Sequence, residues 1–224
     1  MRFFAASLLI TVLLISAASA ELLVTANPLG QGKFAVLGAY INESTYGNVS
    51  GWSLGTIGGY VGYGLTDKLD VFGQLGSATV NGTMPIGVSS LTANGYALNL
   101  KYALIDEGTS LPVSVAIGGG YKASSFTTNI VGGGSVAIPV SQVALAVGIS
   151  KIMAPFIPYG GVAYRSMNSS GTDLGTALNL TVGSAIAWSQ QGAVMLEYNM
   201  VSNSPKGAGS YTNNQIAAGI AYKI

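Results

Sequence analysis

The chain has 224 residues and is 49% hydrophobic, yet it carries only 9 Lys or Arg and 8 Asp or Glu residues. About a quarter of the residues in an ordinary soluble domain are charged, so this composition argues against that class of protein. The net charge of +1 gives no electrostatic surface for nucleic acid. The lack of Cys and His excludes disulfides, thiolate metal sites and catalysis that depends on histidine.

The first twenty residues, MRFFAASLLITVLLISAASA, have the three parts of a secretory signal peptide. Arg2 supplies the basic region, an apolar stretch follows, and small residues lead to the motif ASA at 18–20. A signal anchor would also be apolar, but the small-residue tail and the acidic Glu21 favour cleavage. We therefore predict a cleaved signal peptide at 1–20 and an exported domain at 21–224.

Beyond this segment the chain has no apolar run of about 18 to 20 residues, the length that a membrane-spanning helix needs. Hydrophobic residues recur at every second position in short segments bounded by Gly, Pro, Ser, Thr and Asn, which is typical of β-strands. The pattern predicts ten strands, at 33–41, 53–64, 69–80, 95–104, 112–124, 141–151, 156–167, 176–188, 192–201 and 214–224.

The breaks between these segments alternate in length along the chain. Short breaks lie at 66–68, 105–110, 152–155 and 189–191, and longer polar breaks lie at 42–51, 81–94, 125–139, 168–172 and 202–213. Outer-membrane barrels have short turns in the periplasm and long loops outside the cell. The even strand number, the alternation and the export signal predict a transmembrane antiparallel up-and-down β-barrel with both termini in the periplasm. A soluble secreted β-protein is the alternative, but its outward face would need many more charged residues.

Each predicted strand has one apolar parity and one parity of mostly Gly, Ala, Ser, Thr and Asn. We predict that the apolar parity faces lipid and that the small and polar parity faces the lumen. Aromatic residues on the apolar parity gather near the strand ends, where a membrane interface attracts them. These interface aromatics are Tyr63, Tyr102, Trp188 and Tyr222 at the periplasmic ends and Tyr96, Tyr121 and Tyr164 at the outer ends.

The last strand, QIAAGIAYKI, resembles the C-terminal assembly signature of bacterial outer-membrane β-barrels, which combines alternate hydrophobic positions with a final aromatic residue. Ile216, Ile220, Tyr222 and Ile224 occupy those positions, although the chain ends in Ile224 where Phe is usual. The segments YGLTDKLDVFGQLG and LGQGKFAVLGAY are similar to the small-barrel, porin-like family of Gram-negative envelopes. The resemblance implies an outer-membrane location, with membrane lipid and the barrel-assembly machinery as partners, and it implies no single activity.

The sequence gives little reason to expect chemistry. Ser150 beside Lys151 is formally a nucleophile next to a base, and Asp106 with Glu107 is a pair of carboxylates. An interfacial lysine and a solvated turn explain these pairs better. Acidic residues are few and scattered, so no metal-ligand spacing is present. We expect a protein that is not an enzyme and holds no metal or cofactor.

Six charged residues fall on the lumen parity, although the strand that carries Arg165 has an ambiguous face. They are Asp70, Lys101, Lys122, Arg165, Glu197 and Lys223. One interpretation is that they fill the barrel as buried pairs, and Asp70 and Lys101 lie at the same end of neighbouring strands. The other is that they line a narrow passage, because Gly and Ala on this parity are too small to fill a barrel of ten strands.

On the second interpretation, we predict a narrow porin-like channel for small solutes, with a slight preference for anions. A structural or adhesive barrel that acts through its outer loops is the alternative, and Tyr46, Trp52 and Tyr211 are its aromatic candidates. A third possibility is a lateral opening near Pro112, Pro155 and Pro158. The segment before the first strand either hangs in the periplasm or tucks into the barrel.

Overall fold

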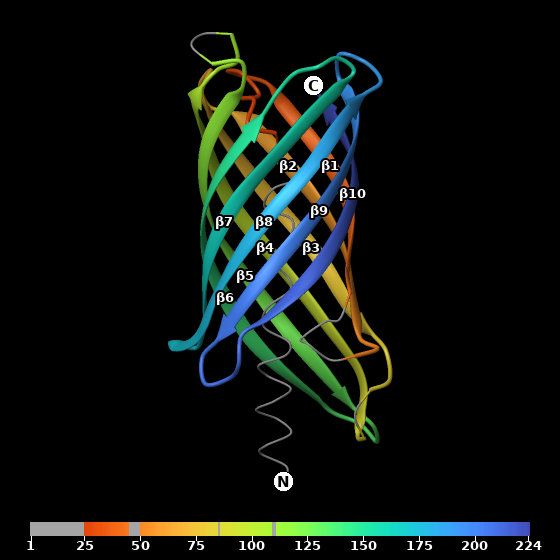
Figure 1. Cartoon of the computed structure of the whole chain (residues 1–224). Coiled ribbons are helices and arrows are strands. Elements are labelled where there is room, and N and C mark those ends of the chain that lie inside the picture. Colours follow the sequence, from red (N-terminus) through yellow and green to blue (C-terminus); the bar gives the residue numbers. More distant parts are fainter. Residues whose placement is uncertain (1–24, 45–49, 85, 109–110) are drawn as a thin grey trace.

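A computed structural model describes residues 25–44, 50–84, 86–108 and 111–224, so the predicted signal peptide at 1–20 and Tyr46 lie outside the described residues. The described chain forms a closed antiparallel barrel (Figure 1). Its strands are β1 (Phe34–Ser44), β2 (Ser53–Gly64), β3 (Leu69–Asn81), β4 (Val88–Ile105), β5 (Ser114–Ile130), β6 (Ser135–Ser150), β7 (Phe156–Ser169), β8 (Thr172–Ala187), β9 (Gly192–Pro205) and β10 (Tyr211–Lys223). No helix in this part of the chain is long and apolar enough to cross a membrane.

Every strand pairs with its neighbours in sequence, and β1 pairs with β10 to close the barrel. At the seam, the backbone N–H of Ile224 donates to the carbonyl of Phe34 (2.8 Å), and the N–H of Phe34 donates back to Ile224 (3.2 Å). Closure pairs the edge strands with each other and leaves no open edge to the sheet. The predicted ten-stranded antiparallel barrel is therefore confirmed.

The two ends of the barrel differ. We call the end that holds the connections at 65–68, 106–113, 151–155 and 188–191 the turn end, and the opposite one the loop end. Strand boundaries at the turn end lie within a few residues of those predicted. At the loop end, much of the polar sequence expected as loops at 81–94 and 125–139 is strand, and these hairpins project at the lower right of Figure 1. The alternation continues there in Ser, Thr and Asn residues. These residues pair across the hairpins and therefore form strands instead of loops.

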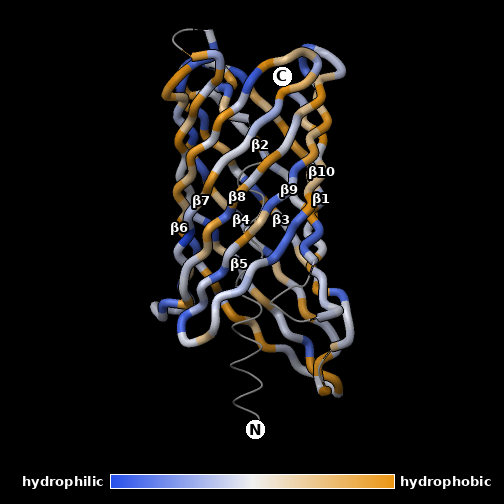
Figure 2. The backbone as a smooth tube through the Cα atoms, viewed as in Figure 1, coloured by the Kyte–Doolittle hydropathy of each residue, from blue (hydrophilic) through white to orange (hydrophobic). Residues whose placement is uncertain are grey.

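The alternation along the strands separates an apolar outer face from an inner face, as predicted. Leu98 and Leu145 are 58% and 67% exposed on the outer face, whereas their neighbours Ala97 and Ala144 are buried inside. Figure 2 shows this alternation as changing colour along each strand. The strand ladders also continue past Pro158, which is in register with Ser184 of β8, so this proline does not interrupt the wall.

Large apolar side chains form two separate clusters inside the barrel. The loop-end cluster contains Trp52, Leu54, Ala78, Val80, Leu91, Ala93, Phe126, Val140, Met167, Ala177 and Val201. The turn-end cluster contains Leu37, Ala39, Ile41, Tyr60, Tyr159, Ala185, Met195 and Ala217. Along β9, Met195 belongs to the turn-end cluster and Val201 to the loop-end cluster, and Glu197 and Asn199 lie between them. A polar layer thus separates two apolar layers.

Candidate functional site

The interior of the barrel holds the charged side chains that the sequence analysis assigned to the lumen. Asp70, Lys101, Lys122, Arg165, Glu197 and Lys223 all lie on the inner parity, and Asp70 and Arg165 are fully buried. The ambiguous face of β7 is thereby resolved, because Arg165 is 0% exposed while Tyr164 is on the outer face. The charged residues therefore come from strands all around the barrel.

One interior charge was missed. Glu43 is 1% exposed and points inward, because β1 continues to Ser44 instead of ending at residue 41. Glu43 lies two residues after Ile41 and therefore shares its inward parity. The polar neighbours Asn42 and Ser44 made this stretch resemble a loop in the sequence, so the parity was not followed that far. With Glu43 included, the described part of the interior carries three acids against four bases, so the basic excess is smaller there than the sequence predicted.

The two glutamates of the polar layer are held by neutral donors. The carboxylate of Glu43 accepts hydrogen bonds from Asn213 Nδ2 (2.5 Å) and Gln215 Nε2 (2.8 Å) of β10. Glu197 is held in the same way, because its carboxylate accepts from Asn199 Nδ2 (2.7 Å) and the hydroxyl of Tyr159 (3.2 Å). Buried carboxylates need such partners, since desolvation of an unpaired charge is costly.

Arg165 of β7 is also fully buried and adds a positive charge to the interior that holds these two acids. The polar groups of the interior therefore come from separate strands, with Glu43 on β1, Arg165 on β7 and Glu197 on β9. Such a layer can remain wet where cavities adjoin it, and it favours neither cations nor anions strongly.

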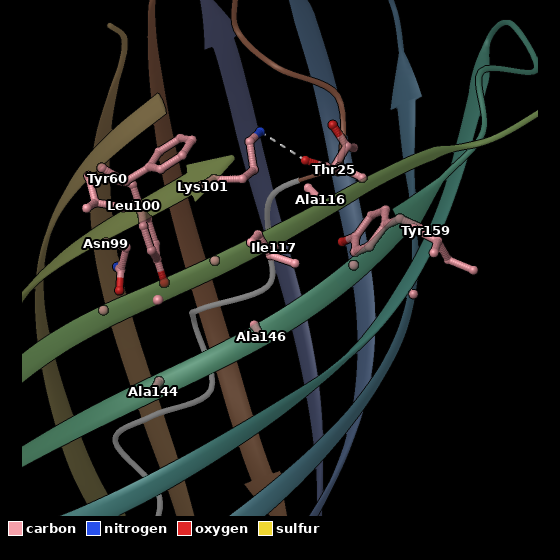
Figure 3. A pocket seen from close by; sticks show the side chains of 18 residues that line it. Thr25, Tyr60, Asn99, Leu100, Lys101, Ala116, Ile117, Ala144, Ala146 and Tyr159 are labelled. Atoms are coloured by element: carbon pink, nitrogen blue, oxygen red, sulfur yellow. Dashed lines mark hydrogen bonds between the residues drawn. The ribbon is translucent and has the colours of Figure 1, made fainter. Parts of the chain in front are cut away.

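A second charged group lies at the turn end. Asp70 of β3 and Lys101 of β4 form an ion pair at 3.0 Å, with the Lys101 side chain only 11% exposed. Lys101 Nζ also donates to the backbone carbonyls of Thr25 (3.1 Å) and Asn27 (2.7 Å), and the Asp70 carboxylate accepts from the N–H of Leu29 (3.1 Å). The described residues before β1 therefore tuck into the mouth of the barrel. Figure 3 shows the bond from Lys101 to Thr25.

Cavities lie next to this group. One of about 70 Å³ is bounded by small residues of β5 and β6 (Figure 3), namely Ala116, Gly118, Gly120, Ala144, Ala146 and Gly148, together with Lys101 and the aromatic rings of Tyr60 and Tyr159. Another of about 170 Å³ lies against Leu37, Met195, Ala221 and Lys223. A third, of about 20 Å³, adjoins Gln74 and Lys122 farther along the interior. In the cavity of about 70 Å³, the empty space lies where Gly and Ala line the wall of β5 and β6, and these residues do not fill it.

The predicted interface aromatics are all on the outer face. Tyr102, Trp188 and Tyr222 are 44%, 54% and 43% exposed toward the turn end, where Tyr63 packs on Phe34 with ring centroids 4.6 Å apart. Nearer the loop end, Tyr96, Tyr121 and Tyr164 are about half exposed, and Tyr40 and Tyr198, which the sequence analysis did not select, are exposed in the same way. The assembly residues Ile220, Tyr222 and Ile224 are also exposed on the outer face of the C-terminal segment.

The remaining candidates have structural partners. Ser150 points inward, where its hydroxyl bonds Asn27 Oδ1 (2.8 Å), whereas its neighbour Lys151 is exposed, so the two do not form a dyad. Glu107 accepts from the backbone N–H of Ile152 (2.7 Å) and joins two turns. No cluster of three or more potential metal ligands occurs within the described ranges. Of the proposed loop anchors, Trp52 is buried in the loop-end cluster and Tyr211 packs against it.

A scan against protein-family models finds no match, and neither does a search of curated proteins. Solved structures do resemble this barrel. The β domain of the Bordetella autotransporter BrkA is 13% identical with a TM-score of 0.51, over 87% of this chain and 100% of that one. The translocator domain of the autotransporter NalP from Neisseria meningitidis is 11% identical (TM-score 0.47; 86% and 88% covered). The N-terminal β-barrel domain of Pseudomonas aeruginosa OprF is also 11% identical (TM-score 0.44; 87% and 99% covered). The chain has the outer-membrane β-barrel fold, and at these identities the likeness extends to the fold alone.

Proposed function

We propose that this chain is a narrow porin-like channel for small solutes in the bacterial outer membrane. The apolar outer face and the aromatic side chains near both ends of the strands support a membrane location, because lipid and headgroup regions attract these side chains. The signal peptide expected at 1–20 supports export. Membrane lipid, the barrel-assembly machinery and small solutes are the partners that this proposal implies.

One observation carries the channel proposal: the wall formed by β5 and β6 is lined by Gly and Ala, and a cavity lies against it. Barrels of eight strands are filled by their own side chains, and a wall of ten strands encloses more space. Ala144, Ala146 and Gly148 do not fill that space. Water can occupy it, since Lys101 and Asn99 line the same cavity.

The charges of the interior indicate weak selectivity. Among the residues that the structure describes, four inner bases accompany three inner acids. The passage therefore suits small neutral or weakly charged solutes, with only a slight preference for anions. The apolar loop-end cluster forms a constriction at the other end, and narrow apolar segments restrict conduction by losing their water. Conductance should accordingly be small.

The test is single-channel recording of the refolded mature protein in a planar lipid bilayer. Ala146→Leu replaces a methyl group of the small-residue wall with an isobutyl group and should lower conductance, because the larger side chain enters the cavity. Val147→Leu is the matched control, since Val147 is 50% exposed on the outer face. A membrane that stays silent at high protein load would reject the channel, and equal conductance in both variants would reject this route through it.

A second function is favoured by one specific observation, an apolar tip at the loop end. Ile86 is fully exposed, and Val131 and Val136 are 65% and 51% exposed. On β5 the outward residues below this tip are Ser125 and Thr127, so a polar band separates the tip from the apolar outer face. Figure 2 shows hydrophobic residues at this projecting end. An isolated apolar patch of this kind is typical of an interaction site, which supports an adhesive or structural role.

The two functions can be separated by changing the tip alone. Consider cells that display the protein and bind to an apolar surface. The double variant Val131→Ser/Val136→Ser should abolish this binding and leave conductance unchanged. If binding persists in this double variant, the tip is not an adhesive site. The matched control is Val143→Ser, which changes the same residue type on the outer face below the tip.

A further inference from the structure

The residues just before β1 cross the turn end of the barrel. On one side, the N–H of Gly32 donates to the carbonyl of Gly64 at the end of β2 (2.9 Å). On the other side, the N–H of Ala26 donates to the hydroxyl of Ser150 at the end of β6 (3.1 Å). Because β6 lies four strands from β2 in the closed order of the barrel, a segment that touches both strands spans the mouth.

Between these two anchors, the segment is held by buried charges. Lys101 binds the carbonyls of Thr25 and Asn27, and Asp70 binds the N–H of Leu29. Hydrogen bonds to ionised groups are stronger than neutral ones, especially away from water. Lys101 and Asp70 thus use the hydrogen-bonding groups left over from their ion pair to hold the backbone of this one segment. An ion pair that served only to fill the interior would not need these contacts.

The wall is also shaped to receive the segment. A Cβ atom on Gly64 would overlap the backbone carbonyl of Gly30, whereas a Cβ atom on Gly62 would first meet the ring of Phe72 and then lie 3.0 Å from the side chain of Leu29. Both glycines face inward, and at Gly64 the lack of a side chain is what lets the segment approach. Gly73 of β3 faces outward and has no atom within 4 Å of the Cβ position.

The segment divides the empty space at this end. Thr25 lines both the cavity of about 70 Å³ and the cavity of about 170 Å³, and Tyr60 and Phe72 also line both. Withdrawal of the segment would join the two cavities and open them to the turn end. We propose that residues 25–32 are a latch that closes the turn-end mouth, and that Asp70 and Lys101 are the binding site for it. This gating role rests on the proposed channel function.

The position of the latch can be measured without any reference to conduction. The chain has no cysteine, so Ala26→Cys introduces one thiol at a site that is only 3% exposed. In refolded mature protein, a membrane-impermeant maleimide should label this thiol slowly. Gly64→Ala should speed labelling about tenfold or more, because the new methyl group displaces Gly30, and a charge-assisted hydrogen bond that breaks with this movement accounts for about that factor.

Two further variants complete this measurement. Asp70→Asn should also speed labelling, since it keeps the side chain's size and removes its charge, whereas Gly73→Ala should leave the rate unchanged. Anomalous migration of the unheated protein on a denaturing gel establishes that each variant is a folded barrel. Equal labelling rates in folded Gly64→Ala and Gly73→Ala would overturn the latch.

Conductance then tests what the latch does. Gly64→Ala should conduct more than Gly73→Ala, and the oxidised double variant Ala26→Cys/Ser150→Cys should conduct least until a thiol reductant breaks the crosslink. If Gly73→Ala conducts and the other variants match it, the latch is overturned and the channel stands. If labelling responds as expected but no variant conducts, the channel is overturned, and with it the gating role of the segment.

Discussion

The two ends of this barrel interior follow the same alternation of residues, yet they are narrowed in different ways. At the loop end, Leu91, Phe126 and Met167 are buried in one apolar cluster supplied by the strands themselves. At the turn end, the inner residues of β5 and β6 that line the cavity are Gly and Ala, cavities remain, and a segment from outside the strands occupies the mouth. Inner side-chain volume, and not the fold, decides which end is narrowed by side chains of its own wall.

The difference implies different responses to substitution. A cluster of packed apolar side chains loses stability when one of them is truncated, because a cavity remains. A charged clamp loses stability when one partner is removed, because the other charge stays buried. The two tryptophans are convenient reporters of these responses, since Trp52 lies in the loop-end cluster and Trp188 lies on the outer face near the turn end.

The largest expected effect is at the loop end. Phe126→Ala should lower the free energy of unfolding by about 3–5 kcal/mol, because Phe126 is 1% exposed and its truncation leaves a cavity. Urea unfolding in lipid vesicles, followed by the fluorescence of Trp52, measures this loss. Phe156→Ala is the control, since Phe156 is 50% exposed on the outer face, where solvent or lipid fills the space. Equal losses in both variants would show that the loop-end cluster is not tightly packed.

The next effect is at the turn end. Asp70→Ala should lower the free energy of unfolding by about 3 kcal/mol. This is toward the lower end of the range for a broken buried ion pair, because Lys101 keeps its bonds to the backbone of the N-terminal segment. The same unfolding experiment applies, with Trp188 as the reporter. Lys68→Ala is the control: Lys68 and Asp106 are 3.8 Å apart and exposed, and such pairs contribute less than about 1 kcal/mol. A loss no greater than that of the control would mean that the clamp does not hold the mouth.

The smallest effect is in the polar layer between the two ends. Tyr159→Phe removes the hydroxyl that donates to Glu197 (3.2 Å) and should lower the free energy of unfolding by about 1 kcal/mol, since Asn199 still donates to the carboxylate. Tyr164→Phe, five residues along the same strand on the outer face, should be nearly neutral. A loss of several kcal/mol in Tyr159→Phe would instead indicate that the layer acts as one cooperative network.

Some interior residues were predicted correctly from the sequence, and others were not. The alternation of residues alone placed Asp70 and Lys101 inside the barrel. It also placed them next to each other, because two residues at the same end of neighbouring antiparallel strands can pair in only a few registers. The same reasoning missed Glu43, since three polar residues in a row are typical of a loop as well as of a strand end. It also expected loops at 81–94 and 125–139, where Ser, Thr and Asn instead continue as paired strands beyond the apolar wall.

The sequence by itself determined the barrel, the strand number and the two faces, because a period of two residues and the need to pair every backbone group are local properties. Only the tertiary structure decided what fills the interior. Trp52, Phe126 and Met167 lie far apart in the chain and meet only when ten strands close, and Thr25 meets Lys101 only because the segment before β1 crosses the mouth. Contacts across a barrel depend on how strands are staggered around its axis, and no pattern within a single strand records that stagger.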